Sequence, residues 1–281
     1  DGRGEVKLTR SLELNHPKEN PDRVVLVSGG LDSYVTLLAA CKDAAEQPGG
    51  PWCVYPVGID YGQLCVVELE YAKHQVAQAM KLYPGVTVHG LRVMTIRGMT
   101  GSSLFPDDLD AEAPDPENLD VVDDTNVPLR NAVFLSLAYS FAEAREAGSV
   151  WCGLTDTGAD GGGTPDARIE FAQAMALAMR LGSNFAKERI SPRLVTPLMG
   201  LPTKVAALLK GYELGIDPFL IWSCFFPQTS DAGLYVPCGA CRACLVLRSA
   251  EEMLASPDVG YEKNLVRALP RVPRKPQGRR G

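Results

Sequence analysis

Short apolar runs alternate with longer segments of helical periodicity along this chain of 281 residues. The apolar runs predict buried strands, and apolar positions spaced three and four residues apart predict amphipathic helices. The predicted strands are Val24–Val27, Cys53–Ile59, Val86–Val93, Ser149–Gly153 and Leu194–Pro197. The predicted helices are Leu31–Ala45, Val66–Leu82, Arg130–Ala147, Ile169–Leu181, Thr203–Leu214 and Cys244–Ala255. Strands that alternate with helices need crossover connections, so the pattern predicts an α/β fold with a mostly parallel, doubly wound sheet.

Two connections between these elements are unusual in composition. Residues 105–124 contain nine acidic residues and no basic residue, which predicts a surface loop or a lid over a ligand site. The segment 155–168 follows the predicted strand Ser149–Gly153 and contains three consecutive glycines. Because ligands of open parallel sheets bind beyond the carboxyl ends of the strands, we expect this glycine-rich loop on the ligand side.

The sequence SGGLDS at residues 28–33 links the first predicted strand to the first predicted helix. Glycine lets the backbone turn tightly and approach a ligand, and free N–H groups at a helix start favour an anion. The hydroxyls of Ser28 and Ser33 add donors, and Asp32 can cap the helix. Neither a Walker A loop nor G-x-G-x-x-G matches this spacing. We interpret residues 28–33 as a phosphate loop, with an ordinary capped turn as the alternative.

Four of the eight cysteines cluster towards the C-terminal end, at Cys224, Cys238, Cys241 and Cys244. Four thiolates match the tetrahedral coordination of zinc, and the spacing C-x2-C-x2-C lets one turn present three sulfurs. Because no open coordination position is implied, we expect structural zinc, with an iron–sulfur cluster as the alternative. The chain shows no signal-peptide pattern, so the cysteines indicate a reducing, cytoplasmic location instead of a disulfide scaffold.

Composition narrows the class of protein. Apolar residues make up 46% of the chain and charged residues 22%, as in soluble globular proteins. No apolar run is long enough to span a bilayer, so we expect no membrane partner. The net charge of −6 argues against broad nucleic-acid binding. We divide the chain into an N-terminal extension (1–22), an α/β domain (23–220), a zinc-binding region (221–265) and a basic, disordered tail (266–281).

The phosphate loop resembles the SGGxDS signature of the PP-loop ATP pyrophosphatases, which have an adenine nucleotide alpha hydrolase-like fold. Together with the C-x2-C-x2-C motif, it makes the chain resemble the QueC family, the 7-cyano-7-deazaguanine synthases. Other segments resemble the family as well over residues 24–248. They are DYGQ at 60–63, VPLRN at 127–131, PDAR at 165–168 and TPLMGLPTK at 196–204. The family patterns at the first three are Y-x-Q, V-P-G-R-N and P-D-C-R.

This resemblance implies a reaction. ATP, accompanied by Mg²⁺, converts the carboxylate of 7-carboxy-7-deazaguanine into an acyl adenylate. Ammonia displaces AMP to give an amide, and a second ATP-dependent activation dehydrates the amide to the nitrile. The departing pyrophosphate must be held by amides, hydroxyls and cations.

The resemblance also implies roles for individual positions. Residues of the phosphate loop would bind ATP: Ser28, Gly29, Gly30, Leu31 as the variable position, Asp32 and Ser33. Arg130 would offset phosphate charge and Asn131 would orient the phosphate, with a capped helix start as the alternative. Lys204 is a cation in the first turn of a predicted helix, where an anionic partner is needed to make it favourable.

The remaining candidates would contact the nucleotide, the base or Mg²⁺. They are Asp60, Gln63, Asp156, Asp166 and Arg168. We assign the catalytic roles to Ser28, Asp32, Ser33, Arg130 and Lys204. The three histidines lie outside the matched motifs, so the sequence presents no histidine general base.

Four positions depart from the family pattern. Leu64 and Cys65 replace the Arg-His of Y-x-Q-R-H, Leu129 replaces the glycine of V-P-G-R-N, and Ala167 replaces the cysteine of P-D-C-R. The changes fall near the substrate end, which predicts retained adenylation with an altered substrate or acceptor. The acceptor would be ammonia or another amine; one interpretation is a protein amine, because QueC-like relatives occur in anti-phage operons.

Two further hypotheses stay open at this point. The first is a tRNA-thiolating or amidating PP-loop enzyme in which Cys65 or Cys152 supplies a thiol. The second is a zinc-stabilised nucleotide-binding protein without catalysis, for which Leu64 and Cys65 are the best support. A homodimer is one assembly that the sequence allows.

Overall fold

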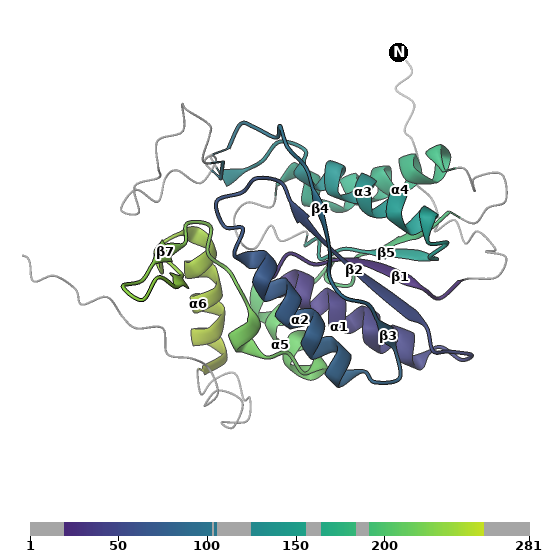
Figure 1. Cartoon of the computed structure of the whole chain (residues 1–281), viewed down its shortest axis with the longest axis horizontal. Coiled ribbons are helices and arrows are strands. Elements are labelled where there is room, and N and C mark those ends of the chain that lie inside the picture. Colours follow the sequence, from purple (N-terminus) through teal and green to yellow (C-terminus); the bar gives the residue numbers. More distant parts are fainter. Residues whose placement is uncertain (1–19, 103, 106–124, 156–163, 184–190, 256–281) are drawn as a thin grey trace, which may run out of the picture.

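The computed structural model describes residues 20–102, 104–105, 125–155, 164–183 and 191–255 (Figure 1). Its strands are β1 Arg23–Leu26, β2 Cys53–Asp60, β3 Thr87–Val88, β4 Arg92–Thr95, β5 Ser149–Trp151, β6 Arg193–Val195, β7 Gln228–Thr229 and β8 Tyr235–Val236. Its α-helices are α1 Leu31–Glu46, α2 Glu68–Leu82, α3 Arg130–Ala144, α4 Ile169–Gly182, α5 Lys204–Leu214 and α6 Arg242–Ala255. Two short 3-10 helices are η3 Pro165–Ala167 and η5 Pro218–Leu220.

A parallel sheet forms the centre of the fold. Its strand order is β3-β2-β1-β5-β6, with β4 also beside β2, and every pair in it is parallel. The chain proceeds to one side of β1 with β2 and to the other side with β5. The carboxyl end of β1 is therefore the topological switch point, where open α/β sheets bind ligands. The predicted α/β fold is confirmed, and residues 28–33 lie at this point.

Helices cover both faces of the sheet (Figure 1). Successive side chains of a strand point to opposite faces, and β1 is buried along its whole length. Val25 packs into the core beneath α1, α2 and α5. Val24 and Leu26 pack into the core beneath α3 and α4. This double burial explains why β1 reads as an unbroken apolar run.

The predicted strand Val86–Val93 is divided into β3 and β4, which pair with successive parts of β2. The carbonyl of Val54 accepts a bond from His89 N on this side of β2. Alternate residues of a strand direct their polar groups to the same side, so Pro56 faces the same neighbour. Proline has no N–H to donate, and the pairing is interrupted at this residue. The unbroken strand was therefore a wrong prediction.

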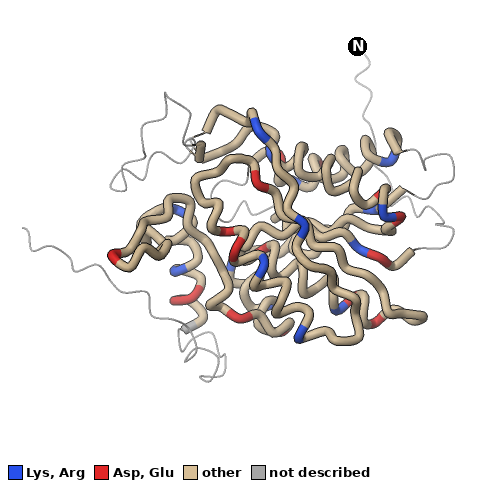
Figure 2. Tube along the Cα trace, in the orientation of Figure 1, with Lys and Arg blue, Asp and Glu red and all other residues tan. Residues whose placement is uncertain are grey.

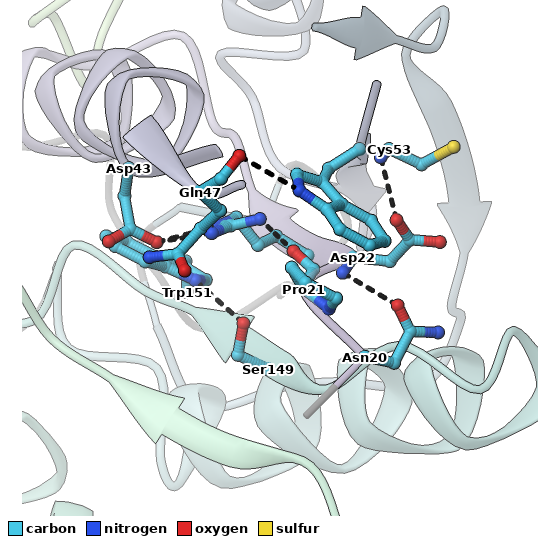
Figure 3. A network of polar contacts seen from close by, with 10 residues as sticks. Asn20, Pro21, Asp22, Asp43, Gln47, Cys53, Ser149 and Trp151 are labelled. Carbon is cyan, nitrogen blue, oxygen red and sulfur yellow. Dashed lines mark hydrogen bonds and ion pairs between the residues drawn. The ribbon is translucent and has the colours of Figure 1, made fainter. Parts of the chain in front are cut away.

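Hydrogen bonds join the amino-terminal ends of three strands, at the end of the sheet away from the switch point. Figure 3 shows the bond between Asp22 and Cys53. Asp22 Oδ1 accepts from Cys53 N at 2.7 Å, and the Asp22 carbonyl accepts from Gly148 N at 3.0 Å. The Arg23 side chain is 3% exposed and donates to Asp43 on α1. Residues 20–22 are thus bonded to the α/β domain, although we had placed them in the N-terminal extension.

The predicted helices and the remaining predicted strands agree with the structure within a few residues at each end. The last helix, α6, begins at Arg242, so Cys244 lies in its first turn. No helix among the described residues is long and apolar enough to cross a membrane. The acidic segment 106–124, residues 156–163 of the glycine-rich loop and the tail 266–281 lie outside the described residues, so the predicted lid and tail remain predictions.

Candidate functional site

The phosphate loop is held together by its two serines. Ser33 Oγ donates to the Gly30 carbonyl at 3.0 Å and accepts from Ser28 N at 3.1 Å. The two serine hydroxyls lie 3.1 Å apart. Ser28 is exposed, whereas Ser33 and Leu31 are buried. The hydroxyl of Ser28 therefore faces outward at the start of α1, where an anion would also meet the helix dipole.

Gly29 fits a place where other residues cannot. Its φ is +90°, and an added Cβ would lie 2.1 Å from the backbone oxygen of Glu68. Gly30, in contrast, has φ of −78° and caps the N-terminus of α1 without a side-chain bond. The first glycine is thus required by the fold itself. The second leaves room above the helix start.

Asp32 and Lys204 meet across the site. Lys204 Nζ lies 2.5 Å from Asp32 Oδ2, although the two residues are 172 positions apart in the chain. Thr203 caps α5 by accepting from Ala206 N, which fixes the first turn that carries Lys204. Asp32 Oδ1 is buried and has no hydrogen-bond partner among the described residues. Within the protein the anionic partner of Lys204 is Asp32, and the contact of Lys204 with an anionic ligand stays a prediction. One carboxylate oxygen of Asp32 remains without a partner in the described part of the chain.

Arg130 and Asn131 occupy the first turn of α3. Arg130 Nη1 donates to Tyr61 Oη at 3.3 Å, and the guanidinium lies over the Tyr61 ring. Burial opposes the charge, but neighbouring Tyr61 and Glu68 outweigh it and raise the pKa of Arg130. Arg130 thus stays cationic next to the end of β2, as a residue that offsets phosphate charge must.

Asp166 caps this same helix from a distant segment. Asn131 N donates to Asp166 Oδ2 at 2.9 Å, and Asn131 Nδ2 donates to the Asp166 carbonyl at 3.1 Å. The second carboxylate oxygen accepts from Thr164 Oγ1 at 2.5 Å, and Asp166 is 5% exposed. Both oxygens are engaged within the protein. The structure gives Asp166 a capping role, and its role in reading the base stays a prediction.

Asp60 and Gln63 are also bonded within the chain. Asp60 forms an ion pair with Arg97 at 3.0 Å, whose hydrogen bond lowers the pKa of Asp60. Gln63 is 4% exposed; its Oε1 accepts from Tyr61 N, and its Nε2 donates to Glu68 Oε1 at 2.9 Å. Gln63 thus shapes the connection after β2 from within, and its predicted contact with the nucleotide stays a prediction.

The other two candidates differ in what the structure says of them. Arg168 is exposed at the N-terminus of α4 and has no side-chain partner among the described residues. Asp156 lies outside the described residues. Both roles stay predictions.

Glu68 belongs to the site, and the sequence reasoning missed it. It is the first residue of α2 and lies directly behind Gly29. Burial raises the pKa of Glu68 to about 7, although hydrogen bonds from Gln63 and Cys65 act in the opposite direction. A carboxyl group that titrates near neutral pH is typical of functional sites. Glu68 is partly exposed as a whole, while its carboxyl group contacts Gln63 and Cys65 inside the connection after β2. Its position two residues after an exposed apolar residue, Val66, gave no signal of this setting.

The four cysteines of the C-terminal cluster converge. Their Sγ atoms all lie within 4.8 Å of one another, and Cys224 is 2% exposed. Backbone N–H groups of Cys238 and Cys241 donate to the sulfurs of Cys224 and Cys238. Zn–S bonds of about 2.3 Å in a tetrahedron place sulfurs roughly 3.8 Å apart, which this cluster accommodates. The residues fit a tetrahedral metal ion.

The departures from the family pattern have clear structural settings. Leu129 precedes α3 with φ of +52°, in the left-handed region that favours glycine, and is 66% exposed. Leu64 is 38% exposed, whereas Cys65 is 3% exposed. Burial raises the pKa of the Cys65 thiol and raises that of Cys152 to about 12. Because thiolates are the nucleophiles, neither cysteine is suited to supply one.

Charge is distributed without a dominant basic face in this view. Figure 2 shows acidic and basic positions interspersed over the described helices and strands. The expectation that broad nucleic-acid binding is not the main task stays a prediction.

Comparison with known proteins places the chain in a family. The family described as "Queuosine biosynthesis protein QueC" matches residues 22–254. A 7-cyano-7-deazaguanine synthase from Acaryochloris marina is 34% identical over 84% of this chain and 96% of that protein. Proteins of the same name from Persephonella marina and Desulfatibacillum aliphaticivorans are 34% and 35% identical. They align over 81% and 84% of this chain, and over 90% and 94% of their own lengths.

A solved structure gives a more distant match. The U34-tRNA thiolase NcsA from Methanococcus maripaludis with its [4Fe-4S] cluster aligns over 71% of this chain and 60% of that chain. Its TM-score is 0.38 at 15% identity, too low to bear on the assignment. The family match and the three relatives, in contrast, span most of the chain. This chain therefore belongs to the QueC family of queuosine biosynthesis proteins.

Proposed function

We propose that this chain is an ATP-dependent enzyme that adenylates the carboxylate of 7-carboxy-7-deazaguanine, or of a similar deazapurine acid, for attack by an amine. The observation that carries the proposal is the Asp32–Lys204 pair beside the phosphate loop at the switch point of the sheet. The names of the relatives, 7-cyano-7-deazaguanine synthases, support the substrate class.

The residues of the site suit this chemistry. A carboxylate is a poor electrophile, so activation attaches its oxygen to the α-phosphate of ATP and releases pyrophosphate. The N–H groups and hydroxyls of the phosphate loop would hold the departing pyrophosphate, and Lys204 and Arg130 would offset its charge. The unpartnered Oδ1 of Asp32 would serve as a ligand of the Mg²⁺ ion that accompanies ATP. The cysteine cluster would hold zinc and stabilise the C-terminal region.

In the second half-reaction the amine nitrogen attacks the acyl carbon. The bond from this carbon to the adenylate oxygen breaks, AMP departs, and the nitrogen loses a proton. With ammonia the product is an amide. A second ATP would then adenylate the amide oxygen and release pyrophosphate. The nitrogen loses both of its protons and the carbon–oxygen bond breaks, so AMP departs with the oxygen and the nitrile remains. A larger amine would stop the sequence at the substituted amide.

The exposed apolar residues favour the larger amine as a second candidate. Leu64 and Leu129 stand where the family pattern has arginine and glycine, and both are exposed at the chain segments that carry Gln63 and Arg130. An apolar surface in place of a cation suits an acceptor with carbon substituents better than ammonium. A protein amine, as in conjugation during anti-phage defence, belongs to this class of acceptor.

The test is incubation of metal-loaded protein with ATP, Mg²⁺, 7-carboxy-7-deazaguanine and ammonium. We expect AMP and pyrophosphate, with twice as much AMP per acid for the nitrile as for the amide. Mass spectrometry distinguishes nitrile, amide and protein conjugate. Lys204→Met should lower kcat/KM for pyrophosphate release by roughly 100-fold or more, whereas Lys210→Met on the same helix should retain the wild-type value. Folded wild-type protein that binds ATP but releases no pyrophosphate with any deazapurine acid and amine would instead favour the non-catalytic hypothesis.

A further inference from the structure

The carbonyl of Gly29 is held from behind by two donors. Gln75 Nε2 on α2 donates to it at 2.6 Å, and Trp222 N donates to it at 2.9 Å. These donors lie 46 and 193 positions further along the chain, so two separate segments converge on one oxygen of the phosphate loop. Such a double contact fixes the direction of the peptide group between Gly29 and Gly30.

The direction of this peptide group matters for an anion. In a trans peptide the C=O and N–H point in opposite directions. With its carbonyl turned towards α2 and Trp222, the peptide directs Gly30 N–H to the opposite side, where it donates to Ser28 Oγ in a long bond of 3.4 Å. Ser28 is exposed, so this is the side open to a ligand. The donors behind the loop thereby present Gly30 N–H to a phosphate.

Without these donors the peptide group could rotate. Its two torsions belong to glycines, for which both orientations are accessible. Rotation would withdraw the N–H and turn a carbonyl oxygen towards the phosphate, replacing an attractive dipole by a repulsive one. Within the loop this peptide has one long bond, from Gly30 N to Ser28 Oγ at 3.4 Å, so the two shorter bonds to the Gly29 carbonyl from outside the loop are what hold its direction.

The side-chain nitrogen of Gln75 uses both of its hydrogens to bond backbone carbonyls. Gln75 is fully buried, and its Nε2 uses a second hydrogen to donate to the Leu220 carbonyl at 2.7 Å. Its Oε1 is buried without a hydrogen-bond partner among the described residues. A buried glutamine with an unpartnered oxygen is unfavourable for stability alone. Its two donated bonds instead tie α2, the phosphate loop and η5 together.

The second donor connects the loop with the cysteine cluster. Trp222 Nε1 donates to the carbonyl of Cys224 at 2.9 Å, and the Trp222 ring packs on Tyr71 of α2. Cys224 is one of the four converging cysteines. Coordination at Cys224 would thus restrict the segment that carries Trp222 N.

We propose that Gln75 and the Trp222 backbone form a lock on the Gly29–Gly30 peptide, and that metal binding by the cysteine cluster tightens this lock and raises the affinity for the phosphates of ATP. The cluster is then more than a stabiliser of the C-terminal region, because its occupancy controls nucleotide binding. The inference rests on the proposed ATP site but not on the identity of the acid or the amine. Gln75 acts as a positioning residue, since it acts on the phosphate through the loop.

The test measures binding of α,β-methylene-ATP by calorimetry, which needs no turnover. Metal-loaded Gln75→Leu should bind about tenfold more weakly than wild type, because its two donated hydrogen bonds are lost and the Gly29 carbonyl is released from α2. Gln78→Leu, three residues along the same helix, is the matched control and should bind like wild type. Chelator-stripped wild type should also bind about tenfold more weakly, and stripping should weaken Gln75→Leu by less, since part of the lock is already gone.

Hydrogen exchange gives a readout that is independent of ATP. Peptides covering residues 28–33 should exchange faster in stripped wild type and in Gln75→Leu, while peptides covering β5 should not change. If Gln75→Leu does not fold, Gln75→Asn replaces it, because the shorter side chain keeps its polarity but loses its reach. If stripping unfolds the protein, the metal-loaded variants decide the question.

The outcomes separate the two proposals. Equal dissociation constants for loaded and stripped wild type, or for wild type and Gln75→Leu, would overturn the lock while leaving the proposed function intact. Nucleotide binding that follows the lock without pyrophosphate release would overturn the proposed function alone. No binding of the nucleotide to loaded wild type would overturn both.

Discussion

Replacing Gly29 by alanine should distort the phosphate loop more than any other methyl addition within it. The added Cβ would lie 2.1 Å from the backbone oxygen of Glu68, whereas ordinary contact begins at 3.4 Å. The difference of these two distances means that loop and helix must separate by 1.3 Å. The obstacle is backbone at the start of α2, so rotation of a side chain cannot relieve it.

The magnitude has two contributions. A φ of +90° disfavours alanine by about 1–2 kcal/mol, and forcing a methyl group into a packed site costs about 1–3 kcal/mol more. We therefore expect a total destabilisation of about 2–5 kcal/mol. Alanine substitutions at two other glycines, Gly62 and Gly30, measure the contributions of φ and of steric contact separately. Gly62 has φ of +88° with nothing near its Cβ position, so alanine there should cost about 1–2 kcal/mol.

Gly30 supplies the control for both effects. Its φ is −78°, and its nearest Cβ contact is Ser28 Oγ at 3.5 Å, so Gly30→Ala should cost less than about 1 kcal/mol. The assay is guanidinium unfolding of the metal-loaded protein, followed by circular dichroism, with the free energies of unfolding compared at equal slopes. If Gly29→Ala were no less stable than Gly62→Ala, the contact with Glu68 would have no consequence and the reasoning would fail.

Three more predictions concern the charges and thiols of the site. Lys204→Met should lower kcat/KM for pyrophosphate release by roughly 100-fold or more. It should change the free energy of unfolding by only about 1 kcal/mol, because the ion pair with Asp32 is partly exposed. Unchanged kinetics would show that this cation does not meet the phosphates. The pKa of Glu68 is raised to about 7, so from about pH 4.5 to 7 the folded protein keeps a proton that the unfolded chain releases, and stability falls as the pH rises through this window. Glu68→Gln should therefore gain stability relative to wild type between pH 5 and pH 8, on the order of 2 kcal/mol in urea unfolding, whereas Glu70→Gln on the exposed face should not; a constant difference across this range would contradict the raised pKa. Cys65→Ser and Cys152→Ser should keep their rates of AMP formation, since burial raises the pKa of both thiols; loss of AMP formation in a folded variant would revive the thiol hypothesis.

The sequence pattern was sufficient to predict those parts of the fold that depend on residues close together in the chain. The apolar run before the phosphate loop predicted β1, and the alternation of strands and helices predicted the parallel sheet and its ligand-binding edge. Close spacing in the chain likewise predicted that Cys238, Cys241 and Cys244 share one site, with Cys224. In each case the information lies within one element or in a repeated pattern.

Other features depend on partners that are distant in the sequence. Gln75 reads as an ordinary helical glutamine until the Gly29 and Leu220 carbonyls meet it in space. In the sequence, Glu68 looks like an ordinary favourable acidic residue at a helix start. Its raised pKa depends on the residues that pack around its carboxyl group, and the sequence pattern does not show them. The division between β3 and β4 arises from Pro56 in the neighbouring strand. Periodicity within one segment contains no information about such neighbours.

The 172 positions between Asp32 and Lys204 have a consequence for synthesis of the protein. At about 5–20 residues per second, the ribosome completes the phosphate loop roughly 10–30 seconds before it adds Lys204. During this interval the loop has neither its cation nor the Trp222 donor that lies still further along the chain. Under the proposed function, a nascent chain would therefore bind nucleotide only weakly, and α5 must dock on α1 before the pair forms. Assembly of the site is thus a late event, completed only when the C-terminal third of the protein has folded onto the first.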